Sequence, residues 1–256
     1  METEKETSHK WNNVYSKHFN GMWYPDEEIV RFAARHINRR VGIELYEPKR
    51  KTNRILDAGC GIGRHVMFFA EQGFDVYGTD ISEEAIEIGK AWAAKHSFKV
   101  NLKVDVAEKL NFDNGFFDLV VSTGVLDHIR FSDAKKAIKE ISRVLAPKGC
   151  VFISLRSTDD SECGRGEKVD KNSFILQEGY EKGIIQHYFD LEELVDLFDG
   201  FKIFDVELSE CRFPGSFGVD KAFLQTSSLN KKYIDLSKEN SLDLKDSRWY
   251  VAAEKV

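Results

Sequence analysis

The stretch Arg54-Ile-Leu-Asp-Ala-Gly-Cys-Gly-Ile-Gly-Arg64 decides the fold of this chain, together with Val76-Tyr-Gly-Thr-Asp80 that follows it. Ile55 and Leu56 indicate the end of a buried strand, the glycines form a loop, and the apolar run from Val66 continues as a helix. Glycine lets the backbone turn tightly and approach a ligand closely, and a helix start presents unpaired N–H groups. A strand, a glycine loop, a helix and an acid ending the next strand predict a nucleoside-binding cradle. The alternative is a tight turn that holds no ligand.

The spacing of the glycines indicates which nucleoside is bound. A dinucleotide fingerprint, Gly-x-Gly-x-x-Gly counted from Gly59, needs a third glycine where this chain has Arg64, which disfavours a nicotinamide dehydrogenase. The chain instead has Gly-x-Gly-x-Gly, preceded by Asp57. On this motif it resembles the class I S-adenosylmethionine-dependent methyltransferases. The resemblance covers about residues 50–208 and the final strand, and its further motifs are Asp80, Asp105, Phe117-Asp-Leu-Val-Val121 and Ile141-Ser-Arg-Val-Leu-Ala-Pro-Lys-Gly149.

Strand and helix patterns alternate along the chain, which predicts an α/β fold with a parallel, doubly wound sheet. The resemblance implies a Rossmann-like sheet of seven strands, mostly parallel, with an antiparallel strand near the C-terminus. Helices are expected before Gly73, after the N-cap Ser82, from Ser132, and from the capping box at Asp190 to near Gly200. The expected strands are Arg54–Asp57, Asp75–Asp80, Lys99–Val104, Phe116–Thr123, Cys150–Leu155, Phe201–Leu208 and Arg248–Glu254.

One domain with an N-terminal cap is the expected organisation. Residues 1–50 form a helical, aromatic cap, and residues 51–256 form the methyltransferase domain with inserted acceptor loops 156–189 and 210–247. Such long loops in compact domains are commonly functional or disordered. The cap residues Trp11 and Tyr15 lie on one helix face; they either bury against the sheet or, as the resemblance suggests, fold over the cofactor.

The composition narrows the function classes. A net charge of −6 argues against binding DNA, RNA or an anionic membrane surface. The charged start shows no secretory segment and no apolar run is long enough for a membrane span, so a cytoplasmic protein is expected. The cysteines Cys60, Cys150, Cys163 and Cys211 are scattered without a Cys-x-x-Cys pair, and no metal-ligand pattern occurs, so a metal-independent enzyme is expected.

The cofactor residues follow in part from position and in part from the resemblance. Asp80 ends a strand about 20 residues after the glycines, where an acid can accept from both ribose hydroxyls; its other possible role is in capping the next helix. By resemblance, Asp105 accepts from the adenine amino group, or serves only as a turn residue. The remaining cofactor-binding residues expected from the resemblance are Trp11, Tyr15, Asp57, Gly59, Cys60, Gly61, Gly63, Ile81, Val106, Thr123 and Gly124. Asp57 either faces the ligand's amino group or orients the glycine loop.

The acceptor side is less defined. Asp127 and His128 follow the fourth strand, where they act in acid–base chemistry or brace the site. His187 lies in the loop between Arg156 and Phe189, and its ordinary pKa near neutrality suits a general base; a surface-turn histidine is the alternative. Further acceptor contacts are expected from Arg212, Phe213 and Phe217.

The sequence therefore predicts an enzyme that transfers the methyl group of S-adenosyl-L-methionine to an oxygen or nitrogen atom. The polar loop favours a small polar or anionic acceptor, such as a sugar, a phosphate-bearing metabolite or a natural-product intermediate. Two alternatives stay open: a methyltransferase acting on a protein or RNA, and a cofactor-binding partner subunit without catalysis.

Overall fold

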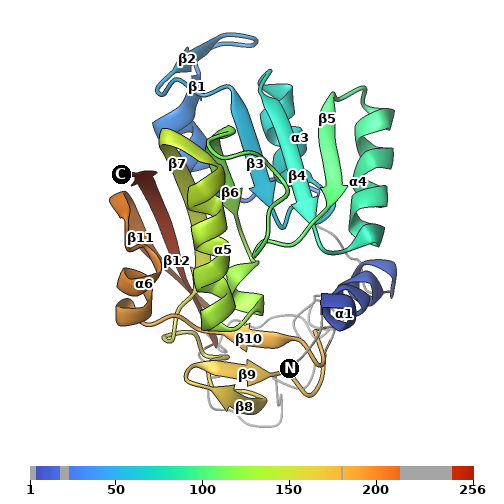
Figure 1. Cartoon of the computed structure of the whole chain (residues 1–256), viewed down its shortest axis with the longest axis vertical. Helices are drawn as coiled ribbons and strands as arrows, with labels where there is room; N and C mark the ends of the chain where they lie inside the picture. Colours follow the sequence, from blue (N-terminus) through green and yellow to red (C-terminus); the bar gives the residue numbers. More distant parts are fainter. Residues whose placement is uncertain (1–3, 18–22, 180, 214–243) are drawn as a thin grey trace.

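A computed structural model describes residues 4–17, 23–179, 181–213 and 244–256. Its centre is a seven-stranded sheet with the order β11-β12-β7-β6-β3-β4-β5 (Figure 1). Strands β3 to β7 run parallel, and β12 is antiparallel to both of its neighbours, so the expected mixed sheet is confirmed. The strands are β3 (Arg54–Ala58), β4 (Asp75–Asp80), β5 (Val100–Val104), β6 (Phe117–Ser122), β7 (Leu145–Arg156), β11 (Phe201–Phe213) and β12 (Leu244–Lys255).

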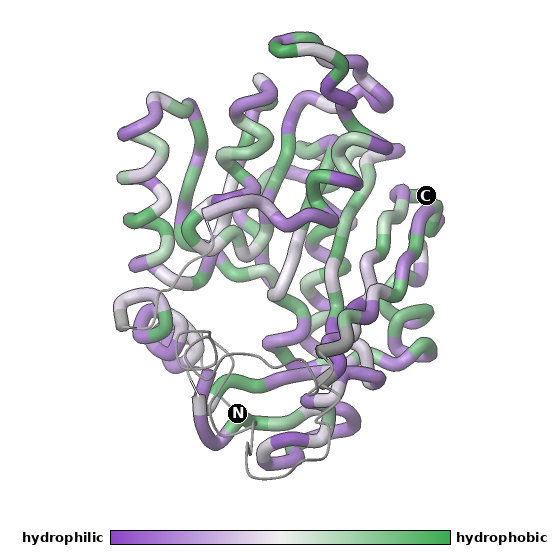
Figure 2. The backbone as a smooth tube through the Cα atoms, turned by 180° about the vertical axis from the view of Figure 1, so that it is seen from behind, coloured by the Kyte–Doolittle hydropathy of each residue, from purple (hydrophilic) through white to green (hydrophobic). Residues whose placement is uncertain are grey.

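Helices cover both faces of this sheet because its strands carry apolar side chains on both sides. Neighbouring residues such as Leu119 and Val120 point to opposite faces and join different hydrophobic clusters. The apolar stretches follow the strands in the middle of the molecule (Figure 2). One face packs against α2 (Glu27–Phe32), η1 (Ala33–Ile37), α3 (Arg64–Glu71) and α4 (Glu83–Lys95), and the other against α5 (Phe131–Val144) and α6 (Leu191–Leu197).

Local signals placed several element boundaries correctly. The Ser82 hydroxyl accepts the Ala85 N–H at the start of α4, and Gly73 follows α3 with a φ of +86°. The capping box between Asp190 and Glu193 is present at the start of α6. Strands β11 and β12 are longer than expected because they pair with each other along their whole length, beyond the part of β12 that pairs with β7.

Two regions hold structure that the sequence did not predict. The expected acceptor loop 156–189 contains an antiparallel sheet of β8 (Glu167–Asp170), β9 (Ser173–Ile175) and β10 (Ile185–His187). Strands β1 (Asn38–Arg40) and β2 (Tyr46–Pro48) form a hairpin before β3. The second expected acceptor loop lies mostly outside the described residues, as do Phe217 and the side chains of Arg212 and Phe213.

Helix α1 (Glu4–Lys17) and the β8–β10 sheet lie together at the end of the main sheet where its parallel strands finish (Figure 1). This carboxyl edge is where open α/β sheets bind their ligands. Within the described ranges, no helix is long and apolar enough to cross a membrane.

Candidate active site

The glycine loop after β3 has a backbone that only glycine adopts easily. Its three glycines have φ values of +80°, +53° and +88°. The Gly59 N–H donates to the Thr79 carbonyl at 2.7 Å, which ties the loop to the end of β4. A Cβ atom on Gly59 would lie 2.1 Å from the Val125 side chain, and one on Gly61 would lie 2.5 Å from the Tyr15 hydroxyl. Both positions therefore require glycine for conformation and for space.

Asp80 organises the backbone around this loop. One carboxylate oxygen accepts the Gly61 N–H and the other accepts the Ser82 N–H, each at 2.8 Å. Burial raises the pKa of Asp80 to about 6, against the lowering effect of these bonds. Each carboxylate oxygen can accept more than one hydrogen bond, so both keep capacity for a diol. Asp80 thus holds the start of α4, and its role in binding ribose stays a prediction.

Asp57 lies at the end of β3 with its side chain almost completely buried. Neither of its carboxylate oxygens has a hydrogen-bond partner. The His65 ring lies beside it, with its Nδ1 atom 3.6 Å from Asp57 Oδ2. A buried carboxylate without partners is costly, and a cationic ligand group would relieve that cost.

Helix α1 docks on the edge of the sheet beside the glycine loop. The Ser8 hydroxyl donates to the Ile81 carbonyl at 2.9 Å. The Asn12 side-chain oxygen accepts from the Ser82 hydroxyl at 2.7 Å and from the Glu84 N–H at 3.2 Å. These bonds attach α1 to the end of β4 and the start of α4.

The aromatic residues of α1 lie over the site instead of packing into a core cluster. The Trp11 ring lies edge-on to the His128 ring with centroids 5.1 Å apart. Burial raises the pKa of Tyr15 well above its usual value, and the nearby Asp80 carboxylate adds to that effect. The Lys10 ammonium donates to the Gly183 carbonyl at 2.5 Å, so α1 also contacts the insertion between β7 and α6. This placement favours the covering role over simple burial against the sheet.

Asp105 serves the turn after β5 in this structure. Its carboxylate accepts from the Asn111 N–H at 2.9 Å and from the Val106 N–H at 3.1 Å. The Val106 N–H was the group expected to meet an adenine ring nitrogen. Asp105 therefore stabilises the turn in this structure, and its binding of the adenine amino group stays a prediction.

Thr123 and Gly124 lie just beyond β6, next to the glycine loop. The Ser122 hydroxyl before them donates to the Ala58 carbonyl at 2.8 Å, which joins the ends of β6 and β3. The Gly124 N–H donates to the Ser154 hydroxyl at 3.1 Å. The two expected residues are thus held at the centre of the carboxyl edge.

Asp127 is fully buried and paired with two arginines. Its Oδ2 atom is 3.0 Å from the Arg248 Nη1 atom and 3.7 Å from the Arg156 Nε atom. Burial alone would raise the pKa of Asp127, but Arg248, then His128 and Arg156, outweigh it, and the pKa is lowered. Of the two expected roles, bracing of the site fits this geometry.

Arg156 ends β7 among several charged side chains. Besides Asp127, its guanidinium lies 3.3 Å from the Glu162 carboxylate and 3.9 Å from the Glu181 carboxylate. The Tyr188 hydroxyl is 3.5 Å from its Nη1 atom. Asp127 also pairs with Arg248, and Glu162 with Arg165, so the charges around Arg156 are balanced and an anionic acceptor stays a prediction.

The two histidines on the acceptor side differ sharply. His187 has no exposed surface, its Nδ1 atom lies 2.8 Å from the Ser173 hydroxyl, and burial lowers its pKa to about 4. The His187 ring therefore packs between the small sheet and Phe131, and its role as general base stays a prediction. His128 lies beneath Trp11, and its Nδ1 atom is buried without a hydrogen-bond partner. The Nε2 atom of His187 is likewise buried without a hydrogen-bond partner, and His128 is the candidate base that lies against α1.

Sequence reasoning missed several residues of this edge. His65 and Arg64 follow the glycine loop and contact Asp26, and Arg248 comes from the last strand to pair with Asp127. Arg64 drew notice only as a departure from a glycine pattern. No local signal marks such contacts because each joins segments far apart in the chain.

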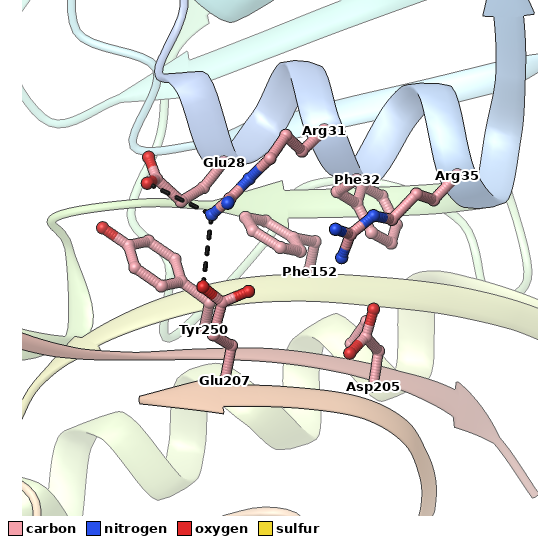
Figure 3. A pocket seen from close by; sticks show the side chains of 9 residues that line it. Glu28, Arg31, Phe32, Arg35, Phe152, Asp205, Glu207 and Tyr250 are labelled. Atoms are coloured by element: carbon pink, nitrogen blue, oxygen red, sulfur yellow. Dashed lines mark hydrogen bonds and ion pairs between the residues drawn. The ribbon is translucent and has the colours of Figure 1, made fainter. Parts of the chain in front are cut away.

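A separate small pocket lies between α2 and the last strands, away from the carboxyl edge (Figure 3). Arg31 spans it, 3.3 Å from Glu207 and 3.6 Å from Glu28, so paired charges occupy its wall. The pocket is lined by Glu28, Arg31, Phe32, Arg35, Phe152, Asp205, Glu207, Tyr250 and Ala252. Over the described residues, no group of three or more His, Cys, Asp or Glu side chains is placed to hold a metal ion.

Known proteins resemble the central part of this chain. Residues 55–149 match the family described as a methyltransferase domain. Tocopherol O-methyltransferase of Arabidopsis thaliana is 28% identical over 58% of this chain and 46% of its own length. Ajmaline N-methyltransferase of Rauvolfia serpentina is 32% identical over 42% of this chain and 37% of its own. The chain spans about half the length, or less, of these curated relatives.

A solved S-adenosylmethionine-dependent methyltransferase from Methanosarcina mazei has the same fold, with a TM-score of 0.61. It is 22% identical, and the match covers 81% of this chain and 94% of that one, so it bears on the fold alone. S-adenosylmethionine is the methyl donor of the family that these matches share. Residues 55–149 thus match a methyltransferase domain, and the chain has the fold of solved S-adenosylmethionine-dependent methyltransferases.

Proposed function

We propose that this protein transfers the methyl group of S-adenosylmethionine to an oxygen or nitrogen atom of a small polar metabolite. The observation that carries the proposal is the carboxylate of Asp80, which holds the Gly61 and Ser82 N–H groups at the carboxyl edge. It does so beside a loop whose conformation demands glycine. This arrangement suits a ribose above backbone that a ligand can approach closely.

The chain's own residues would bind and orient the reactants. Asp80 would accept from the ribose hydroxyls, and Asp57 would face the ammonium of the amino-acid portion. Thr123 and Gly124 would line that portion from the β6 side. When bound, the cofactor supplies an activated methyl group on a sulfonium. Positioning of the acceptor against such a group can supply up to about 7–11 kcal/mol of the rate enhancement.

His128 is the proposed acid–base residue. His128 Nδ1 would accept the proton that the acceptor oxygen or nitrogen gives up when it takes the methyl group that the bound cofactor would supply. That atom is buried and has no other partner. A base of this kind contributes about 10²–10⁴-fold when the acceptor must lose a proton.

A small acceptor fits this edge better than a protein or RNA. Helix α1 contacts both the start of α4 and the insertion at Gly183, so the edge is covered from two sides.

Incubation with a metabolite extract and isotope-labelled S-adenosylmethionine tests the proposal. Mass spectrometry should find a product that carries one labelled CH₂ more than a small metabolite of the extract. Tight cofactor binding without any labelled product across a broad extract panel would favour the cofactor-binding partner subunit. Labelled protein or RNA in place of a metabolite would favour the macromolecular alternative.

A further inference from the structure

The strongest unexplained feature of the donor side is the isolation of Asp57. Its side chain is 1% exposed and both carboxylate oxygens lack hydrogen bonds. The charge of Asp57 helps to raise the pKa of Tyr15, Cys60 and Asp80, so its carboxylate faces the same space as the cofactor loop. A buried carboxylate without hydrogen bonds persists when some other group offsets its charge.

That group is the ring of His65, the second residue of α3. The ring is 3% exposed and lies between two carboxylates. Its Nδ1 atom is 3.6 Å from Asp57 Oδ2, and its Nε2 atom is 3.3 Å from both the N–H and Oδ2 of Asp26. His65 therefore connects the cofactor loop to the segment that precedes α2.

The position of Asp26 allows two protonation states of this ring. In the neutral ring, Nε2 accepts the Asp26 N–H and Nδ1 carries the proton toward Asp57. In the charged ring, both nitrogens donate, one toward each carboxylate. Arg64 holds both Asp26 oxygens, at 2.7 and 2.9 Å, so Asp26 stays in place in either state.

We propose that His65 is a positioning residue whose proton sets how strongly Asp57 attracts the ammonium group of the cofactor's amino-acid portion. The inference rests on the proposed function, because it needs that cofactor in the loop. A charged His65 ring competes with the ligand ammonium for the Asp57 carboxylate. A neutral ring leaves the whole charge of Asp57 to the ligand.

The direction of the pH dependence follows from the charges around the ring. The charged groups that act on it are Asp26 from the segment before α2, Asp57 from β3 and Arg64 from α3. Burial disfavours the charged ring, but Asp26 and then Asp57 outweigh it, and the pKa of His65 is raised. Affinity for an ammonium-bearing ligand should therefore rise as pH rises through this pKa, with release of a proton on binding.

Two ligands separate this effect from other titrations. S-adenosylhomocysteine carries the amino-acid portion, whereas 5′-methylthioadenosine has the same nucleoside and sulfur without it. Asp80, with a pKa of about 6, faces the ribose that both ligands share, so its titration cancels in their affinity ratio. Calorimetric titration of the full chain across about pH 5.5–8 should show that the affinity for S-adenosylhomocysteine, divided by that for 5′-methylthioadenosine, rises about fivefold or more.

His65→Asn serves as the matched variant because its amide can donate to Asp57 without ever becoming charged. This variant should bind both ligands. The ratio of the two affinities should then change with pH only where the ammonium group of S-adenosylhomocysteine itself titrates. If His65→Asn fails to fold, Asp57→Asn gives the same information, since it removes the carboxylate for which the two cations compete. A pH-independent ratio in the unmodified protein, or an unchanged pH dependence in these variants, would overturn the role of His65. Failure of both ligands to bind would overturn the proposed function as well.

Discussion

The donor half and the acceptor half of the carboxyl edge are built in different ways. The donor half, around β3 and β4, uses backbone N–H groups, three glycines and short acidic side chains close together in the chain. The acceptor half, around β6 and β7, uses buried charges from distant segments, such as Asp127 with Arg248, 121 residues apart. The donor half can therefore be read from a motif, whereas the acceptor half exists only in the folded chain.

The largest effect should come from breaking the acceptor half at Arg248. Arg248→Met leaves the buried Asp127 carboxylate with only the more distant Arg156, and it should lower the free energy of unfolding by about 3 kcal/mol. Urea denaturation measures this change. Lys135→Met is the control, because it breaks the exposed pair with Asp196 and should cost under about 1 kcal/mol. Equal losses in the two variants would show that the Asp127 cluster does not hold this half together.

The donor half should be most sensitive at Gly61. An alanine there meets an unfavourable φ of +53° and the Tyr15 hydroxyl, costing about 1–3 kcal/mol, so cofactor affinity should fall about tenfold or more. Gly73→Ala is the matched control, since Gly73 has a φ of +86° but open space around it. Calorimetry with S-adenosylhomocysteine should separate the two variants. Similar affinities in both would mean that Tyr15 does not lie against the loop when ligand is bound.

Within the donor half, Asp80 and Asp105 should differ. Asp80→Ala removes the acceptor proposed for two ribose hydroxyls. It should weaken the binding free energy of S-adenosylhomocysteine by at least about 1 kcal/mol. Asp105→Ala removes the bonds from the Val106 and Asn111 N–H groups and should lower stability while changing affinity little. A larger affinity loss for Asp105→Ala than for Asp80→Ala would restore the adenine role of Asp105 and remove Asp80 from the ribose.

The smallest effect on turnover should come from His187. Because its ring is buried against Ser173 and Phe131, His187→Gln should leave turnover of the acceptor found in the extract screen within about threefold. Stability should fall in the same variant as the packing changes. A loss of turnover of about 10²-fold with normal cofactor affinity would instead make His187 the base.

The same contrast explains what the sequence could predict. Strand β4 begins and ends where expected, and Ala85, Ile86, Gly89 and Ala93 of α4 are all buried, because local periodicity encodes which face is apolar. Asp80 lies where its distance from the glycines placed it, because consecutive parallel strands end at the same edge.

The candidate catalytic residues depend on tertiary contacts. His187 was a candidate general base, with a surface-turn histidine as the alternative, and the β8–β10 sheet removes its side chain from solvent. Asp127 was a candidate acid, but Arg248 from the last strand neutralises it. Burial and ion pairing at such positions depend on which distant segments meet in the fold. The spacing of residues within one segment does not predict those contacts.

Binding of S-adenosylhomocysteine to the full chain, compared with NAD under the same conditions, tests the central claim most directly. Isothermal titration calorimetry should show micromolar-scale affinity for S-adenosylhomocysteine and for S-adenosylmethionine, and no comparable heat with NAD. A preference for NAD would contradict the assignment of the glycine loop and of Asp80 to a sulfonium nucleoside.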